Sequence, residues 1–163
     1  MNAPSCSLIV STYNWPEALE LVLKSIMEQK KLPNEVVVAD DGSTQPTREL
    51  IKKYQDIFPI PLKHVWHKDD GFRKTIVLNM AFREATSDYI VQIDGDTILH
   101  PYFIADHLDF AEKNCWVNGS RVLLNLKKSK EILETKSIDL SVFTQGITNH
   151  MNAIRSPLLR KLL

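Results

Sequence analysis

The sequence has 163 residues, a length typical of one domain or of a large part of one. Hydrophobic residues make up 44% of the chain and charged residues 25%, which excludes a disordered or fibrous protein because a sizeable core can form. The 20 basic and 20 acidic side chains give a net charge of zero, so no overall electrostatic attraction to nucleic acid is expected.

The chain begins with a strand and a helix in its predicted structure. Residues 7–11 form an apolar run of the kind found in strands that are buried on both faces, and we expect this strand to be central. Asn14 is expected to cap a helix, because Pro16 follows in the first turn and apolar residues recur at helical spacing as far as Ile26.

The next segments repeat this alternation. A second buried strand is predicted over residues 36–39, after which the polar residues 40–43 form a turn. Residues 47–54 have the pattern of a helix, and residues 62–66 form the third predicted strand.

Another helix and strand follow. The helix is predicted over residues 74–85 and the strand over residues 89–93, directly before Asp94-Gly95-Asp96. A further helix is expected to start at Pro101. Strands that alternate with helices predict an α/β fold, with a mostly parallel sheet flanked by helices on both faces.

The last part of the chain has a weaker pattern. Residues 127–130 are a charged run, residues 138–152 have no clear period, and Ser156-Pro157 can begin a helix that runs to the last residue. Residues 120–163 carry 8 basic and only 3 acidic side chains. We expect a compact domain over residues 1–125 and an incomplete segment over residues 126–163 that is truncated inside a structural element.

Cysteines and hydrophobicity indicate the compartment. Cys6 and Cys115 are far apart in the sequence and are expected to be small buried residues, and no signal-peptide pattern opens the chain. The longest apolar runs are far shorter than the ~20 residues of a membrane span. We therefore expect a cytoplasmic protein with at most peripheral contact with the inner face of a membrane.

Polar or acidic clusters follow three of the predicted strands. These clusters are Thr12-Tyr13-Asn14, Asp40-Asp41-Gly42-Ser43 and Asp94-Gly95-Asp96. Ligands of parallel α/β sheets bind at the carboxyl ends of the strands. The three clusters are therefore expected to meet at one edge of the sheet and to form a binding site.

Asp94-Gly95-Asp96 has the composition of a site for a metal ion and a diphosphate. Carboxylates are hard ligands of the kind that Mg²⁺ or Mn²⁺ combines with phosphate oxygens, and glycine allows close approach of the backbone. An isolated Asp-Gly-Asp is more often an ordinary turn. Its position after a buried strand, together with the other clusters, favours the metal site.

The other acidic residues suggest contacts with a nucleotide. A turn needs only one side chain of the Asp40-Asp41 pair, which leaves the second carboxylate to accept hydrogen bonds from a nucleoside. The stretch 69–74 is either a solvated loop or a phosphate site, in which Arg73 and Lys74 would face phosphate near the start of a helix, where backbone N–H groups also favour anions.

Taken in order, these motifs resemble the donor-binding half of the family 2 glycosyltransferases, which have the Rossmann-like GT-A fold. The resemblance covers roughly residues 5–125 and is carried by residues 8–14, 38–43, 71–79 and 89–96. It implies an enzyme that transfers a sugar from a nucleotide-diphosphate donor, with a UDP-sugar as the leading candidate. It also implies a divalent metal ion, Mn²⁺ or Mg²⁺, as cofactor.

The resemblance further implies which residues form the site. Thr12 and its neighbours would lie beside the nucleoside, Asp40 or Asp41 would bind the base, and Asp94 would contact ribose or sugar. Asp96, with Asp94, would hold the metal ion. The donor-binding residues implied in this way are Thr12, Tyr13, Asn14, Glu17, Asp40, Asp41, Gly71, Arg73, Lys74, Asn79, Asp94 and Gly95.

Enzymes of the family that this chain resembles invert the anomeric centre. For this chain the resemblance implies a bacterial-type surface glycan or a lipid-linked molecule as acceptor. A base deprotonates the acceptor hydroxyl while the metal ion stabilises the departing diphosphate. The family's base is a carboxylate that follows the metal motif, where this chain offers Glu131, Glu134 and Asp139 in no matching context. Residues 76–78 also differ from the Ala-Arg of many relatives.

Three other functions can be compared with this one. A sugar-phosphate nucleotidyltransferase would have a Gly-rich, Arg-bearing loop where this chain has residues 12–16. A receiver-like signalling module would have a lysine at the end of a later strand, and this sequence has none there. A non-catalytic protein that binds a nucleotide sugar, without acceptor site or base, stays open as an alternative.

Overall fold

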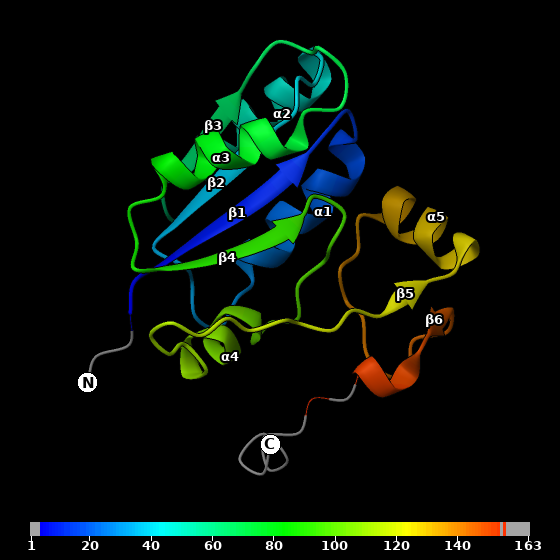
Figure 1. Cartoon of the computed structure of the whole chain (residues 1–163). Coiled ribbons are helices and arrows are strands. Elements are labelled where there is room, and N and C mark those ends of the chain that lie inside the picture. The colour runs from blue at the N-terminus through cyan, green and yellow to red at the C-terminus, as the bar shows by residue number, and fades with distance from the viewer. Residues whose placement is uncertain (1–3, 154, 156–163) are drawn as a thin grey trace. The chain divides into compact units, whose positions relative to one another are not determined.

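The computed structural model describes residues 4–153 and 155 (Figure 1). The chain divides into two compact units on either side of the peptide bond between Val117 and Asn118. The predicted boundary between residues 125 and 126 therefore falls within the second unit, and the roles assigned to the two parts stay predictions. The helix predicted after Ser156 lies outside the described residues.

Four parallel strands form the sheet of the first unit. They are β1 (Cys6–Thr12), β2 (Glu35–Asp40), β3 (Leu62–Trp66) and β4 (Tyr89–Asp94). Their spatial order is β3-β2-β1-β4, which confirms the parallel sheet and the inner position of the first strand. Thr12 lies beside Asp40 and Ser11 beside Asp94, so the carboxyl ends of three strands are level.

Helices cover both faces of this sheet (Figure 1). The core residues of α1 (Pro16–Met27), α2 (Gln45–Gln55) and α4 (Phe103–Asp109) pack on one face, and those of α3 (Lys74–Glu84) pack on the other. Strand side chains alternate between the faces, so Leu8 and Val10 contact the first set of helices while Ile9 contacts α3.

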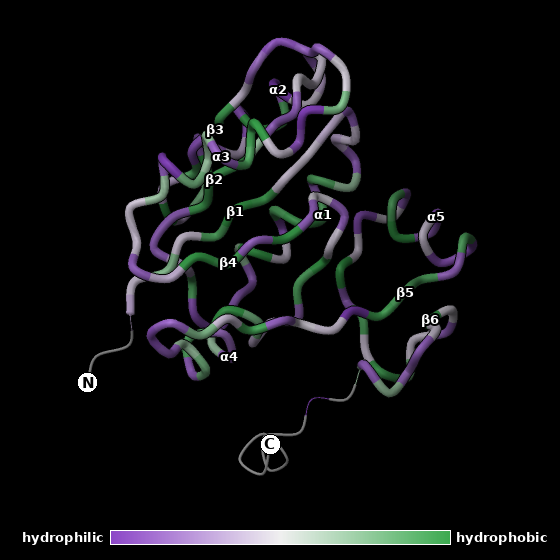
Figure 2. The backbone as a smooth tube through the Cα atoms, viewed as in Figure 1, coloured by the Kyte–Doolittle hydropathy of each residue, from purple (hydrophilic) through white to green (hydrophobic). Residues whose placement is uncertain are grey.

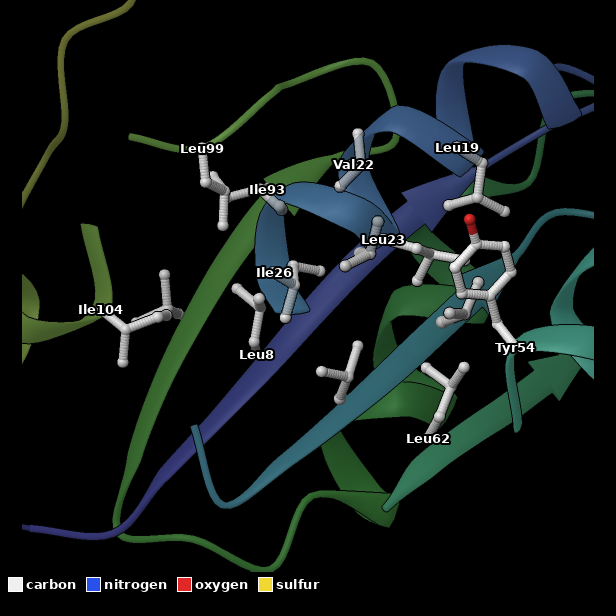
Figure 3. Packing of buried hydrophobic residues seen from close by; sticks show 14 of the residues in the cluster. Leu8, Leu19, Val22, Leu23, Ile26, Tyr54, Leu62, Ile93, Leu99 and Ile104 are labelled. Carbon is white, nitrogen blue, oxygen red and sulfur yellow. The ribbon is translucent and has the colours of Figure 1, made fainter. Parts of the chain in front are cut away.

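The larger part of the core lies between the sheet and α1. Figure 3 shows Leu19, Val22, Leu23 and Ile26 of α1 above Leu8 of β1, and all five side chains are fully buried. The four α1 residues have the helical spacing from which the sequence predicted this helix. Full burial of a leucine or isoleucine side chain contributes about 1.5–3 kcal/mol. In Figure 2, the green of hydrophobic residues marks much of β1 and β2.

Glu35 ties together the amino ends of the strands, opposite the predicted site. Its Oε1 accepts hydrogen bonds from Ser7 Oγ at 2.6 Å and from the Thr86 backbone N–H at 2.7 Å. Lys63 Nζ lies 2.6 Å from Oε2. Burial disfavours the charged form, but the hydrogen bonds from Lys63, Ser7 and Thr86 outweigh it and lower the pKa of Glu35 to about 2.

The structure corrects three local expectations. Asn14 does not cap α1. It has a left-handed φ of 46°, which asparagine tolerates, and its Oδ1 accepts from the Thr44 backbone N–H at 2.8 Å. Pro101 precedes α4, which begins at Phe103 after a turn. Cys6 is buried as predicted, but Cys115 is exposed because it follows α4 in a stretch without core contacts.

The second unit is small. The antiparallel strands β5 (Leu123–Leu124) and β6 (Ile147–Thr148) accompany α5 (Leu126–Thr135) and the 3-10 helix η1 (His150–Ala153). Asn125 caps α5, because its side chain accepts from the Lys128 backbone N–H at 2.9 Å. Within the described part of the chain, no helix is long and apolar enough to cross a membrane.

Candidate functional site

An open pocket of about 200 Å³ lies at the carboxyl ends of β1, β2 and β4. The pocket is smaller than the ~300–1,000 Å³ of sites that enclose a drug-sized ligand, so a larger ligand would extend beyond its rim. Its lining residues are Ser11, Thr12, Tyr13, Trp15, Ala39, Asp41, Phe72, Lys74, Asp94, Gly95 and Asp96. The three polar clusters thus meet at one edge, as the sequence predicts.

The two adjacent aspartates after β2 differ in their surroundings. Asp40 is fully buried, and its carboxylate accepts from the Ser43 backbone N–H at 2.7 Å and contacts His64 Nε2 at 2.9 Å. Asp41 lines the pocket instead. Its Oδ1 lies 2.9 Å from His67 Nε2, and its Oδ2 accepts from the Arg73 backbone N–H at 3.0 Å.

The loop between β3 and α3 is attached to the site by several contacts. Asp69 lies against Gly42, where a Cβ would come within 2.6 Å of the Asp69 Cα. Gly42 also has a φ of +90°, so no other residue fits well there. The Tyr13 hydroxyl donates to Asp69 Oδ2 at 3.1 Å. Phe72, at the far end of the loop, lines the pocket and is 89% exposed.

Lys74 brings a positive charge into the pocket. It begins α3, and its Nζ lies 2.5 Å from Asp94 Oδ1. The same carboxylate oxygen accepts from Ser11 Oγ at 3.0 Å. Asp94 is therefore held from two sides, by the central strand and by the first residue of α3.

Gly95 and Asp96 form the part of the pocket that follows β4. A Cβ on Gly95 would lie 2.8 Å from the Ser11 carbonyl oxygen and 3.1 Å from Thr12 Cβ, so the backbone approach requires glycine. The Gly95 N–H donates to the Ser11 carbonyl at 2.7 Å. Among the described residues, none forms a hydrogen bond or ion pair with the exposed Asp96 side chain.

The donor set suits a cation that also binds a substrate phosphate. In the described part of the chain, no group of three or more histidine, cysteine and acidic side chains converges as a complete metal cage. Mg²⁺ is commonly bound through one or two carboxylates together with phosphate oxygens and water. Asp96, with its free carboxylate, fits this pattern, and Asp94 fits less well because Lys74 already occupies one oxygen.

Several residues proposed for the site from the sequence do not line the pocket. Asn79 is exposed on α3, and Glu17 is exposed beside Glu20 and Glu49 at the surface of α1 and α2. Arg73 forms an ion pair with Asp70, three residues earlier. The residues that the pocket does not include are Asn14, Glu17, Asp40, Gly71, Arg73 and Asn79.

Other residues of the site were not found by sequence reasoning. Trp15 and Phe72 lie at the pocket, and their positions next to Asn14 and Gly71 were the available signal. His64 and His67 contact the two aspartates, but they belong to β3 and the loop that follows it. Nothing in the local pattern links them to residues more than 20 positions away.

Comparisons with known proteins identify relatives of the chain by sequence and by fold. The sequence model of the family described as "Glycosyl transferase family 2" matches residues 7–155. Chondroitin synthase of Escherichia coli is 28% identical over 152 residues, which cover 90% of this chain and 22% of that protein. Hyaluronan synthase of Pasteurella multocida is 33% identical over 103 residues, or 63% of this chain and 10% of that protein. The chain spans less than a quarter of the length of both.

Solved structures show the same fold. Mannosyltransferase PcManGT from Pyrobaculum calidifontis, in complex with GDP-Man and Mn²⁺, is 29% identical with a TM-score of 0.61. The alignment covers 68% of this chain and 33% of that chain. TarS 1-349 of S. aureus in complex with UDP-GlcNAc is 28% identical with a TM-score of 0.54, and 65% and 30% of the two chains are covered. These similarities confirm the predicted α/β fold class.

Proposed function

The chain belongs to glycosyl transferase family 2, and from this premise we propose that its pocket binds a nucleotide-diphosphate sugar as the donor of an inverting glycosyl transfer. One observation carries the proposal. The carboxylate of Asp96, free of any partner among the described residues, shares a pocket with the Lys74 ammonium group at the carboxyl edge of a parallel sheet. Such a pair suits a diphosphate and its counterion.

The residues of the pocket divide among the parts of the donor. Asp41, Thr12 and Tyr13 form the side that would face the nucleoside, with Asp41 accepting from the base. Lys74 would contact the diphosphate, and Asp94 the ribose or sugar. Asp96 would hold Mn²⁺ or Mg²⁺, and the bound ion would supply charge stabilisation for the departing diphosphate.

The sugar, the nucleotide and the acceptor are proposed from the relatives of the chain. We favour a UDP-sugar, which is supported by the complex of TarS with UDP-GlcNAc, although PcManGT was solved with GDP-Man. The names of the relatives, chondroitin and hyaluronan synthases, support a glycan acceptor, and a lipid-linked acceptor fits the same chemistry. We place the reaction in the cytoplasm, because both cysteines are free thiols in the structure.

A thermal-shift panel tests the donor site. UDP-, GDP- and other nucleotide sugars are added with and without Mn²⁺, and a ligand at about 100 times its dissociation constant should stabilise the fold by ~2.7 kcal/mol. We expect a shift with at least one nucleotide sugar, larger in the presence of Mn²⁺. The free sugars and Mn²⁺ alone serve as controls. A chain that responds to no nucleotide sugar would not have the proposed site.

A further inference from the structure

Both ring nitrogens of His67 face hydrogen-bond acceptors. Nδ1 lies 2.8 Å from the backbone oxygen of Lys68, and Nε2 lies 2.9 Å from Asp41 Oδ1. A carbonyl oxygen can only accept a hydrogen bond, and so can an ionised carboxylate. Each nitrogen therefore needs its own proton, whereas a neutral imidazole carries only one N–H.

We propose that His67 is held as an imidazolium and acts as a positioning residue for the donor pocket. It does not line the pocket itself. It would fix the Asp41 carboxylate and, through it, the loop that carries Phe72 and leads to Lys74. The inference rests on the proposed donor site and names a residue that controls its geometry.

Asp41 links the imidazole to both sides of the pocket. The Asp41 backbone N–H donates to the Thr12 carbonyl at 3.0 Å, which joins it to the end of β1. Its second carboxylate oxygen accepts from the Arg73 backbone N–H, directly before the first residue of α3. That first residue is Lys74, whose ammonium group contacts Asp94. A displaced Asp41 would therefore also displace the cation of the pocket.

Burial and charge strengthen the influence of His67 on Asp41 and on the pocket. The side chains of His67 and Asp41 are only 17% and 7% exposed, so solvent screens their attraction less than it screens a surface pair. The pocket contains the carboxylates of Asp41, Asp94 and Asp96 but only one ammonium group. An imidazolium next to Asp41 offsets one of the three negative charges, which helps a diphosphate to bind.

The charged groups around His67 come from three neighbouring elements. Asp41 follows β2, while Lys68, Asp69 and Asp70 belong to the same loop as the imidazole. Asp70 is paired with the Arg73 guanidinium at the start of α3. Asp69 accepts from the Tyr13 hydroxyl and the Gly71 backbone N–H. Asp41 is thus the carboxylate bonded to the ring itself.

His64 provides a matched control. Its Nε2 contacts the buried Asp40, and no acceptor among the described residues lies at its Nδ1, so one N–H is enough for its contacts there. Both histidines thus pair with one aspartate of the same dipeptide. Only the His67 pair adjoins the pocket.

The protonation state can be measured without any ligand. Nitrogen-15 NMR of the whole chain at about pH 7 distinguishes doubly from singly protonated imidazoles, and the His67 signals are assigned by their absence in His67→Gln. We expect two protonated nitrogens in His67 and one in His64. A singly protonated His67 would overturn the assignment, whatever the chain binds.

Calorimetry with a nucleoside diphosphate and Mn²⁺ tests the positioning role. Glutamine at position 67 can donate to Asp41 or to the Lys68 carbonyl but carries no charge, so we expect His67→Gln to lower affinity about 10-fold. Asp41→Asn should lower affinity further, because it also alters the pocket wall, and the His67→Gln change should then have little added effect. His64→Gln should bind within about twofold of the wild type.

The outcomes separate this inference from the proposed function. Unchanged affinity in His67→Gln, with the wild type binding well, would exclude the positioning role. A similar loss in His64→Gln would show a general effect of damaged histidine–aspartate pairs, and it would also overturn the inference. A wild type that binds no nucleotide would contradict the proposed donor site, while the NMR result would still report the state of His67.

Discussion

Asp40 and Asp41 are adjacent in sequence, but the structure gives them different tasks. Asp40 is buried and closes the turn after β2, so Asp40→Ala would leave the Ser43 N–H and His64 without their acceptor. We expect it to lower the free energy of unfolding by about 1–3 kcal/mol. Affinity for a nucleoside diphosphate, measured on the folded fraction, should stay unchanged. Asp41→Asn should instead lower that affinity in calorimetry, because Asp41 lines the pocket.

Asp96 allows a test of the metal ion. Because its side chain is exposed and lines the pocket, Asp96→Asn should leave the unfolding temperature nearly unchanged. We expect it to remove the increase in nucleoside diphosphate affinity that Mn²⁺ causes in the wild type, as measured by calorimetry. Asp56→Asn, which changes another exposed acid at the end of α2, is the matched control. An intact Mn²⁺ effect in Asp96→Asn would exclude its role as ligand.

For single residues, the sequence predicts which residue types form the pocket better than it predicts their contacts. Seven of the proposed donor and metal residues line the pocket, because clusters at the carboxyl ends of parallel strands must meet. The sequence left open which of Asp40 and Asp41 faces the ligand. That choice depends on His64 and His67, whose contacts with the aspartates arise only when β3 pairs with β2.

At the scale of the elements, the close approach between the end of β1 and the turn after β4 depends on Gly95. Gly95→Ala would place a Cβ 2.8 Å from the Ser11 carbonyl oxygen, so one of the two segments must move. We expect a loss of about 1–3 kcal/mol in unfolding free energy together with weaker nucleotide binding. Gly71→Ala meets no atom within 4 Å but has a φ of +76°. It should cost about 1–2 kcal/mol through backbone strain alone.

The amino ends of the strands should make stability depend on pH through Glu35. Its pKa is about 2 in the fold against 4.5 for an unperturbed glutamate. A lowered pKa stabilises the fold above the unfolded value, so this contribution, about 3 kcal/mol, is complete above pH 4.5 and is lost as pH falls towards 2. Glu35→Gln should therefore destabilise the protein more in urea titrations at neutral pH than at about pH 2.5. An equal loss at both pH values would contradict this assignment.

The alternation of strands and helices could be predicted from the sequence, because the spacing of apolar residues differs clearly between buried strands and helices. Apolar runs mark β1 and β2, and helical spacing marks α1. The starts of the helices were less predictable. Asn14 has the residue type of a cap, yet its amide is used by Thr44 from the next loop, a contact that depends on the folded sheet. Sequence spacing alone contains no information about such a partner.

For the molecule as a whole, we expect donor binding to be easier to detect than sugar transfer. The three carboxylates of the pocket already have tasks: Asp41 contacts His67 and the loop, Asp94 contacts Lys74, and Asp96 is proposed for the metal ion. Transfer requires a base within about 3 Å of the acceptor hydroxyl. A radiolabelled-donor assay with glycan and lipid-linked acceptors should therefore show slow donor hydrolysis and little transfer. Multiple turnovers at about 1 per second would show that another group acts as the base.

The two cysteines have a practical consequence for labelling. Burial raises the pKa of the Cys6 thiol to about 11, and the side chain is fully enclosed, so it should not react with maleimides at neutral pH. Cys115 is exposed, two residues before the end of the first compact unit. The native chain can thus carry a single fluorophore at Cys115 without any substitution. Fluorescence anisotropy of that probe would then report on the chain at Cys115 alone.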